Sequence, residues 1–254
     1  MANRTLWMGV LTSGLAILVV AGCRRSDPDR LAVPSTTPSA AADPCARGES
    51  VDPPRAEMEP ARVAFEARRY SEAMKKFDVM AEKYPYSATV RVWRAEATLY
   101  QYKRSDGSER FEQAASDALP FYRAAEALHE KGCRLPDEAE YYLRMGAAYA
   151  HLRKRDASEA AVQLRIARKT FPDSAEATYA LARASCLLEL VDDCAKYFEE
   201  TLRIGRELRR PIFLRTHRSM EEWIRRSTTQ TEFEPLRRDP RYQQILKEAR
   251  AASD

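Results

Sequence analysis

Apolar residues recur at a spacing of three and four positions from about Ala61 to Leu208. This period places one apolar stripe along each helix. Short turns that contain Pro, Asp or Gly interrupt the stripes. We therefore predict an all-α chain in which antiparallel helical hairpins stack on one another over residues 56–210.

The flanks of this region follow other patterns. Residues 23–55 are rich in Pro, Ala, Ser, Thr and Asp without an apolar period, so we predict a flexible stalk and no core residue before Ala61. After Arg210 we predict a helix from Pro211 to about Arg226, within a C-terminal helical cap over residues 211–254. The residues expected to cover the last hairpin are Trp223, Ile224, Phe233, Leu236, Tyr242, Ile245 and Leu246.

The first 22 residues form a segment of a third kind. A basic Arg4 precedes the apolar stretch 6–20, which is shorter than the roughly 20 residues that span a bilayer. The stretch ends in Val20-Ala21-Gly22-Cys23. This sequence resembles a bacterial lipoprotein signal peptide over residues 1–22, with its lipobox. The alternative is an ordinary secretory signal or a short anchor helix, in which the cysteine occurs by chance.

The lipoprotein resemblance implies several properties. The mature chain would begin at Cys23, whose sulfur would carry diacylglycerol, and several acyl chains together would anchor it stably in a membrane. Because Arg24 and not an aspartate follows the cysteine, the resemblance implies an outer-membrane lipoprotein that faces the periplasm.

A unit within the helical region resembles the tetratricopeptide repeat, in which small and large core residues alternate and a proline ends the second helix. The first copy carries Tyr70, Ala73, Phe77 and Pro85. A second copy carries Leu143, Gly146, Tyr149, Ala160, Leu164, Ala167 and Pro172. A third copy carries Leu181, Ala182, Cys194 and Phe198. The resemblance implies a solenoid of stacked hairpins, and the alternative is an irregular helical bundle with chance matches.

In this family the first helices of the repeats form the ligand-binding surface. By this analogy the partner-binding candidates are Glu140, Leu143, Ala147, His151, Tyr179 and Arg183. Mixed charge and aromatic side chains at these positions would suit a peptide ligand.

Four cysteines remain if Cys23 is lipidated, and an exported chain can form disulfides. Cys186 and Cys194 are equidistant from Leu190, where we place a hairpin turn, so antiparallel helices would set them opposite each other. Cys45 and Cys133 would then pair by elimination. The alternative is that Cys186 and Cys194 are small core residues without a bond.

The sequence offers no catalytic, cofactor-binding or metal-binding site. Its three histidines do not share a metal-ligand or catalytic spacing, and there is no glycine-rich phosphate loop. The 42 basic and 38 acidic residues are interspersed and leave a formal charge of only +4, a pattern that disfavours nucleic-acid binding.

These observations predict a lipid-anchored periplasmic scaffold, not an enzyme, that binds a protein or peptide of the cell envelope. The alternative is a subunit of an envelope assembly machine that serves β-barrel assembly, pilus formation or secretion. Residues 82–87 are similar to the first repeat of the lipoprotein subunit of the β-barrel assembly machinery. An envelope hydrolase is the third possibility, for which the sequence carries no catalytic motif.

Overall fold

The computed structural model describes residues 44–45, 47, 51–102, 108–207 and 218–251. These residues belong to one compact unit, Ala41–Asp254, whereas the predicted signal peptide and most of the predicted stalk lie outside the described residues. The described part contains helices and no strands, so the all-α prediction is confirmed there. The helices are α1 (Arg55–Glu66), α2 (Tyr70–Lys83), α3 (Ala88–Gln101), α4 (Ser108–Glu130), α5 (Asp137–Arg153), α6 (Ala157–Thr170), α7 (Ala175–Leu187), α8 (Val191–Glu207), α9 (Met220–Thr229), α10 (Glu234–Arg237) and α11 (Arg241–Ala251), with the 3-10 turn η2 (Thr231–Phe233) between α9 and α10.

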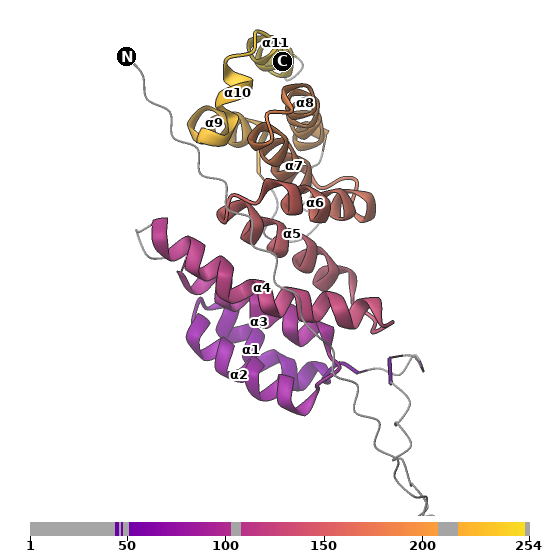
Figure 1. Ribbon diagram of the computed structural model, residues 1–254. Helices are drawn as coiled ribbons and strands as arrows, with labels where there is room; N and C mark the ends of the chain where they lie inside the picture. Colours follow the sequence, from indigo (N-terminus) through magenta and orange to yellow (C-terminus); the bar gives the residue numbers. More distant parts are fainter. Residues whose placement is uncertain (1–43, 46, 48–50, 103–107, 208–217, 252–254) are drawn as a thin grey trace, which may run out of the picture. The chain divides into compact units, whose positions relative to one another are not determined.

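From α1 to α8, each helix packs against the next one in the chain (Figure 1). The odd-numbered helices also contact one another, α3 with α5 and α5 with α7. Their apolar faces are rich in alanine; Ala95, Ala147 and Ala182, for example, are buried. Small side chains let helix axes approach closely, which is how one helix can pack against neighbours on several sides.

The same type of turn follows helices α1, α4, α5 and α7, with a positive φ at Arg68, Gly132, Arg155 and Glu189. The α1–α2 turn has a positive φ at Arg68, of 61°, and the α5–α6 turn has a positive φ at Arg155, of 58°. In both turns the next residue donates its N–H to a carbonyl five positions earlier, Arg69 to Ala64 and Asp156 to His151. This bond satisfies carbonyl groups that the end of a helix leaves unpaired.

The joints that follow α2 and α6 are also alike. Tyr84-Pro85 follows the last residue of α2, and Phe171-Pro172 follows the last residue of α6. Ser87 and Ser174 then accept the N–H of Val90 and Ala177 and cap the next helix. These positions have one constant offset along the chain, so α1–α3 and α5–α7 share the turn and cap residues at equivalent places.

The buried cap Ser174 is expected to contribute to the stability of the fold. Its Oγ lies 3.0 Å from the hydroxyl of Tyr141 and also accepts the N–H of Ala177 at 3.1 Å. We expect Ser174→Ala to lower the free energy of unfolding by about 2 kcal/mol, because both polar partners lose their bond. Urea unfolding measures this. The control Ser219→Ala removes the exposed cap of α9 and should cost only about 1 kcal/mol; equal losses would contradict the role of the Tyr141 contact.

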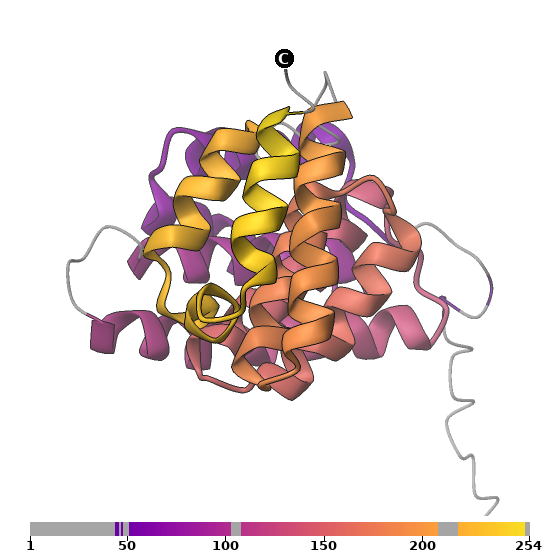
Figure 2. The same cartoon turned by 90° about the horizontal axis from the view of Figure 1, so that it is seen from above.

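The C-terminal helices α9 and α11 lie beside α8 (Figure 2). The residues predicted to cover the last hairpin are buried in one cluster with residues of α7 and α8. The prediction of one helix from Pro211 to Arg226 is wrong, because residues 218 and 219 are not helical and α9 begins at Met220. Ser219 accepts the N–H of Glu222 and so fixes this start. Residues 208–217 lie outside the described part.

The packed structure begins earlier than the sequence predicted. Cys45 and Met58 are buried, which contradicts the expectation of no core residue before Ala61. Asp52, placed in the predicted stalk, accepts hydrogen bonds from Ser87 at 2.5 Å and from Thr89 at 2.8 Å. A single carboxylate at the start of a helix makes these bonds without any apolar period, so periodicity could not reveal it.

Two disulfides join described residues. Cys45 bonds to Cys133 with Cα atoms 4.5 Å apart, and Cys186 bonds to Cys194 with Cα atoms 5.1 Å apart. These are the pairs that the sequence suggested. The second bond closes the hairpin of α7 and α8 around Leu190, whereas the first ties the chain before α1 to the turn between α4 and α5.

Candidate functional site

A groove with a volume of about 1070 Å³ runs along the odd-numbered helices. Helices α3, α5 and α7 contribute most of its described lining, and the α1–α2 region, Phe111 of α4 and the region of α9 contribute the rest. Its described lining residues include Tyr70, Tyr100, Tyr141, Tyr142 and Tyr149. A groove with several tyrosines combines apolar contact area with hydroxyl groups, which suits a polypeptide ligand.

The α5 side of the groove follows from helical spacing. Tyr142, Tyr149 and Arg153 are seven and then four positions apart, so they lie along one face of α5. Acidic residues occupy the first turn of α5, whereas Arg153 is in its last turn. Both placements are favourable to the helix dipole.

Hydrogen bonds hold the tyrosines of the groove in place. The hydroxyl of Tyr149 donates to Glu176 of α7 at 2.9 Å, and the hydroxyl of Tyr141 lies 3.0 Å from Oγ of Ser174. Burial raises the pKa of both phenols well above the usual value, and the negative charge of Glu176 adds to the effect. The two tyrosines therefore remain neutral and act as hydrogen-bonding groups.

Gly146 is the position in the groove lining where α5 packs closely against side chains of α3 and α4. A methyl group at this position would overlap the hydroxyl of Tyr122 and the carboxylate of Glu96. These two buried groups are themselves joined, because the Tyr122 hydroxyl donates to Glu96 at 2.7 Å. The absent side chain of Gly146 thus makes room for a buried hydrogen bond between α3 and α4, against which α5 packs.

Arginine residues line the groove along much of its course. They come from the α1–α2 turn, α5, α7 and the region of α9: Arg68, Arg153, Arg183, Arg218 and Arg226. Arg183 forms an ion pair with Glu232, and Arg226 pairs with Glu222 at 2.9 Å. The pKa of Glu232 is lowered by Arg183 even though burial acts in the opposite direction.

Arg153 is in a different environment. Its guanidinium donates to the backbone carbonyl of Leu99 at 3.3 Å and lies 5.2 Å from the ring centre of Phe111. Burial lowers its pKa, because the cation loses contact with water. No carboxylate of the described residues forms an ion pair with it.

Of the six binding residues predicted from the sequence, only Arg183 is among the described lining residues of this groove. Arg183 lines it, whereas Leu143, Ala147 and Tyr179 are buried between helices. His151 is 9% exposed, and its Nδ1 lies 3.0 Å from Asp156. Glu140 is half-buried and is not among the described lining residues.

The predicted faces therefore need a correction on α5 and α7. Both helices pack against helices on several sides, and the faces that reach the groove differ from the predicted ones. Tyr149, Arg153 and Glu176 are among the lining residues, and none of the three was a predicted binding residue. Arg153 lies four positions from Tyr149, a residue of the predicted repeat, and Glu176 lies seven positions from Arg183, a predicted binding residue. This helical spacing was a signal that could have found them.

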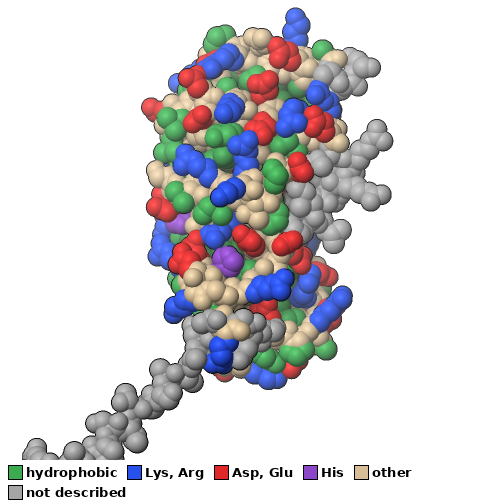
Figure 3. All heavy atoms as spheres, turned by 90° about the vertical axis from the view of Figure 1, so that its right-hand side faces the viewer, with side chains coloured by type: hydrophobic (Ala, Val, Ile, Leu, Met, Phe, Trp, Pro, Cys, Tyr) green, Lys and Arg blue, Asp and Glu red, His purple; other side chains and the backbone are tan. Residues whose placement is uncertain are grey.

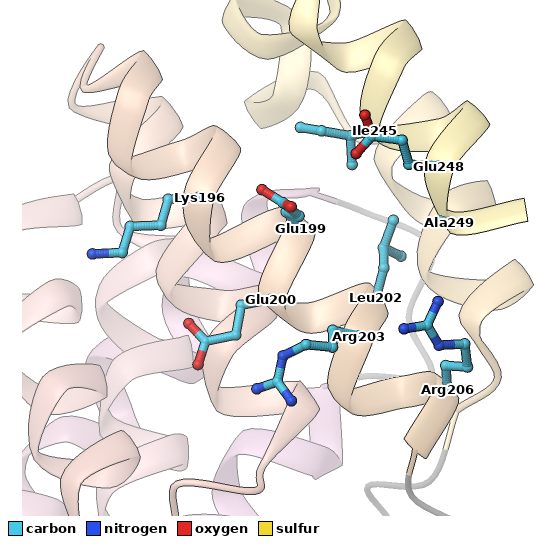
Figure 4. A pocket seen from close by; sticks show the side chains of 9 residues that line it. All are labelled: Lys196, Glu199, Glu200, Leu202, Arg203, Arg206, Ile245, Glu248 and Ala249. Carbon is cyan, nitrogen blue, oxygen red and sulfur yellow. The ribbon is translucent and has the colours of Figure 1, made fainter. Parts of the chain in front are cut away.

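A second hollow of about 480 Å³ lies between α8 and α11 and shares no described lining residue with the groove (Figure 4). Leu202, Ile245 and Ala249 supply its apolar surface. Basic and acidic side chains surround it in equal number, namely Lys196, Arg203, Arg206, Glu199, Glu200 and Glu248. The balance of charge leaves this hollow without a preference for a cationic or an anionic ligand.

The face of the molecule in Figure 3 carries mixed charge. On this face, Lys and Arg side chains alternate with Asp and Glu. Within the described ranges, no group of three or more His, Cys, Asp or Glu side chains could hold a metal ion. No helix in that part of the chain is both long and apolar enough to cross a membrane.

The fold and the groove define an all-helical protein whose odd-numbered helices line a tyrosine- and arginine-rich groove. No protein-family model matches the chain, and no curated protein matches it.

Proposed function

We propose that this protein is a lipid-anchored periplasmic scaffold that binds a protein or peptide partner in the groove of a tetratricopeptide-like solenoid. The observation that carries the proposal is the groove itself, because it runs across α3, α5 and α7 and not along one hairpin. A ligand site shared by successive hairpins is characteristic of repeat proteins. The turn and cap residues that α1–α3 and α5–α7 share at equivalent places support the repeat architecture.

The proposed location rests on Cys23, which lies outside the described residues, and on the disulfides. Two disulfides between buried cysteines support an oxidising compartment such as the periplasm. We expect Cys23→Ala to abolish incorporation of labelled fatty acid in cells. Cys45→Ala should leave the labelling intact, and labelling that persists in Cys23→Ala would contradict the anchor.

Site-specific cross-linking in intact cells tests the binding function. We expect a photoreactive phenylalanine analogue at Tyr149, in the groove, to form a discrete adduct with a protein partner. The matched control is the same analogue at Val79 of α2, a residue that is 66% exposed and is not among the described lining residues of the groove. Equal adducts from both positions, or none from Tyr149, would contradict the proposal.

The identity of the captured protein then separates the two versions of this function. Components of β-barrel assembly, of a pilus or of a secretion system would identify the chain as a subunit of an envelope assembly machine. Another envelope protein would support a scaffold outside those machines.

A further inference from the structure

The acidic and basic side chains of the groove differ in whether they are free to bind a ligand. Its acidic lining residues already have partners: Glu66 with Arg62 at 3.8 Å, Glu96 with Tyr122 at 2.7 Å, Glu176 with Tyr149 at 2.9 Å, and Glu232 with Arg183. By contrast, neither Arg68 nor Arg153 forms an ion pair with a carboxylate of the described residues. The groove therefore offers more cationic than anionic capacity to a ligand.

Two further arginines have N–H groups without a hydrogen-bond acceptor among the described residues. The Nε atoms of Arg183 and Arg218 are buried and have no hydrogen-bond partner within the described part of the chain. A guanidinium has five N–H donors, and a buried donor without a partner carries a cost in free energy. An acceptor on a ligand in the groove would remove that cost.

Among the arginines of the groove, Arg153 has the strongest need for a carboxylate partner. It lies at the end of α5, half-buried, with a backbone carbonyl and the ring of Phe111 as neighbours. The carboxylate of Glu96 acts on it electrostatically but does not form an ion pair with it. Removing a guanidinium from water without a carboxylate partner is unfavourable, and a carboxylate that arrives with the ligand would compensate. Charge-assisted bonds of this kind are about twice as strong as neutral ones.

We propose that the groove binds an extended polypeptide segment with several acidic side chains, one of which pairs with Arg153. This proposal rests on the proposed function and names the chemistry of the partner. The arginines come from four separate places along the groove, at Arg68, Arg153, Arg183 and the pair Arg218 and Arg226, so they match several carboxylates along a segment better than a single terminal one. The tyrosines between them provide contact for the apolar side chains of the same segment.

Fluorescence anisotropy with the full-length protein in mild detergent tests the proposal. The probe is a short labelled peptide of alternating Glu and Leu with an amidated C-terminus, and its twin carries Gln in place of every Glu. We expect the Glu peptide to bind at least about tenfold more tightly than the Gln twin at low salt, and the difference to shrink as salt is added. A free-acid version of the Gln twin that gained the same affinity would instead point to a terminal carboxylate and overturn the proposal.

Two arginine variants locate the effect. Arg153→Gln should remove most of the preference for the Glu peptide, whereas the control Arg155→Gln should keep it, because Arg155 lies two positions away but outside the described groove lining. Thermal unfolding checks that Arg153→Gln is folded, and Arg68→Gln, an exposed position, provides a second variant with a smaller expected loss.

Equal binding of the Glu and Gln peptides, no binding of either, or an unchanged preference in Arg153→Gln would each overturn the acidic specificity. These results are distinguishable from a failure of the proposed function, which is judged by cross-links from Tyr149 in cells. A groove that captures a partner yet prefers the Gln peptide would retain the function and lose the specificity proposed here.

Discussion

Gly146→Ala is expected to lower the free energy of unfolding by about 3 kcal/mol, as overpacking of a tight core does. The added methyl would overlap the Tyr122 hydroxyl and the Glu96 carboxylate, so the buried hydrogen bond between them must break or α5 must shift. Urea unfolding of the full-length protein measures this loss. Peptide affinity should fall as well, because Tyr149 and Arg153 lie on the same helix.

Gly205→Ala is the matched control for this prediction. There the nearest atom to an added methyl is Cδ1 of Trp223 at 3.2 Å, a contact that a small shift can relieve. Alanine also favours the helix by about 1 kcal/mol over glycine, so the net change at residue 205 should be small. A loss at Gly205 as large as at Gly146 would show that the Tyr122 contact is not responsible.

The second large effect is expected from the bond between Cys45 and Cys133. Because these residues are 88 positions apart, closing the loop reduces the entropy of the unfolded chain by an amount worth about 4 to 5 kcal/mol. The double variant Cys45→Ala/Cys133→Ala should therefore unfold at a markedly lower urea concentration than the parent protein. Asp52 should also become less well held at the start of α3.

A comparison with the second disulfide tests the cause. Cys186 and Cys194 are only 8 positions apart, so the same entropy argument gives about 2.5 kcal/mol for their bond. Measured under oxidising conditions, Cys186→Ala/Cys194→Ala should lose less stability than the first pair. The reverse order would mean that packing in the α7–α8 core, and not loop closure, dominates.

Most of the helical organisation could be predicted from the chain, because apolar periodicity reports burial on one helix face. The burial of Phe77, Leu164 and Phe198 follows from that period. Capping cannot be read from periodicity, since it depends on one polar side chain at a particular place. For this reason the sequence did not predict the Ser219 cap before α9 or the contacts of Asp52.

The groove was harder to predict than the fold. The helices that line it were expected from the repeat resemblance, but which stripe of each helix is accessible depends on packing from several sides. Arg153 and Glu176 are polar residues on largely buried helices, and only the three-dimensional arrangement brings them to one groove. An alignment of the chain with itself would have shown Arg68 with Arg155 and Ser87 with Ser174 as equivalent positions.

The bond between Cys45 and Cys133 also determines which helix a pulling force on the N-terminal chain reaches first. Helices α1 to α4 lie inside the covalently closed loop, so tension applied to the chain before Cys45 passes through the sulfur atoms to residue 133. The first helix that transmits this force is then α5, which carries Tyr149 and Arg153. A force applied on the N-terminal side would thus reach the groove through α5, along a covalent path that bypasses the first four helices.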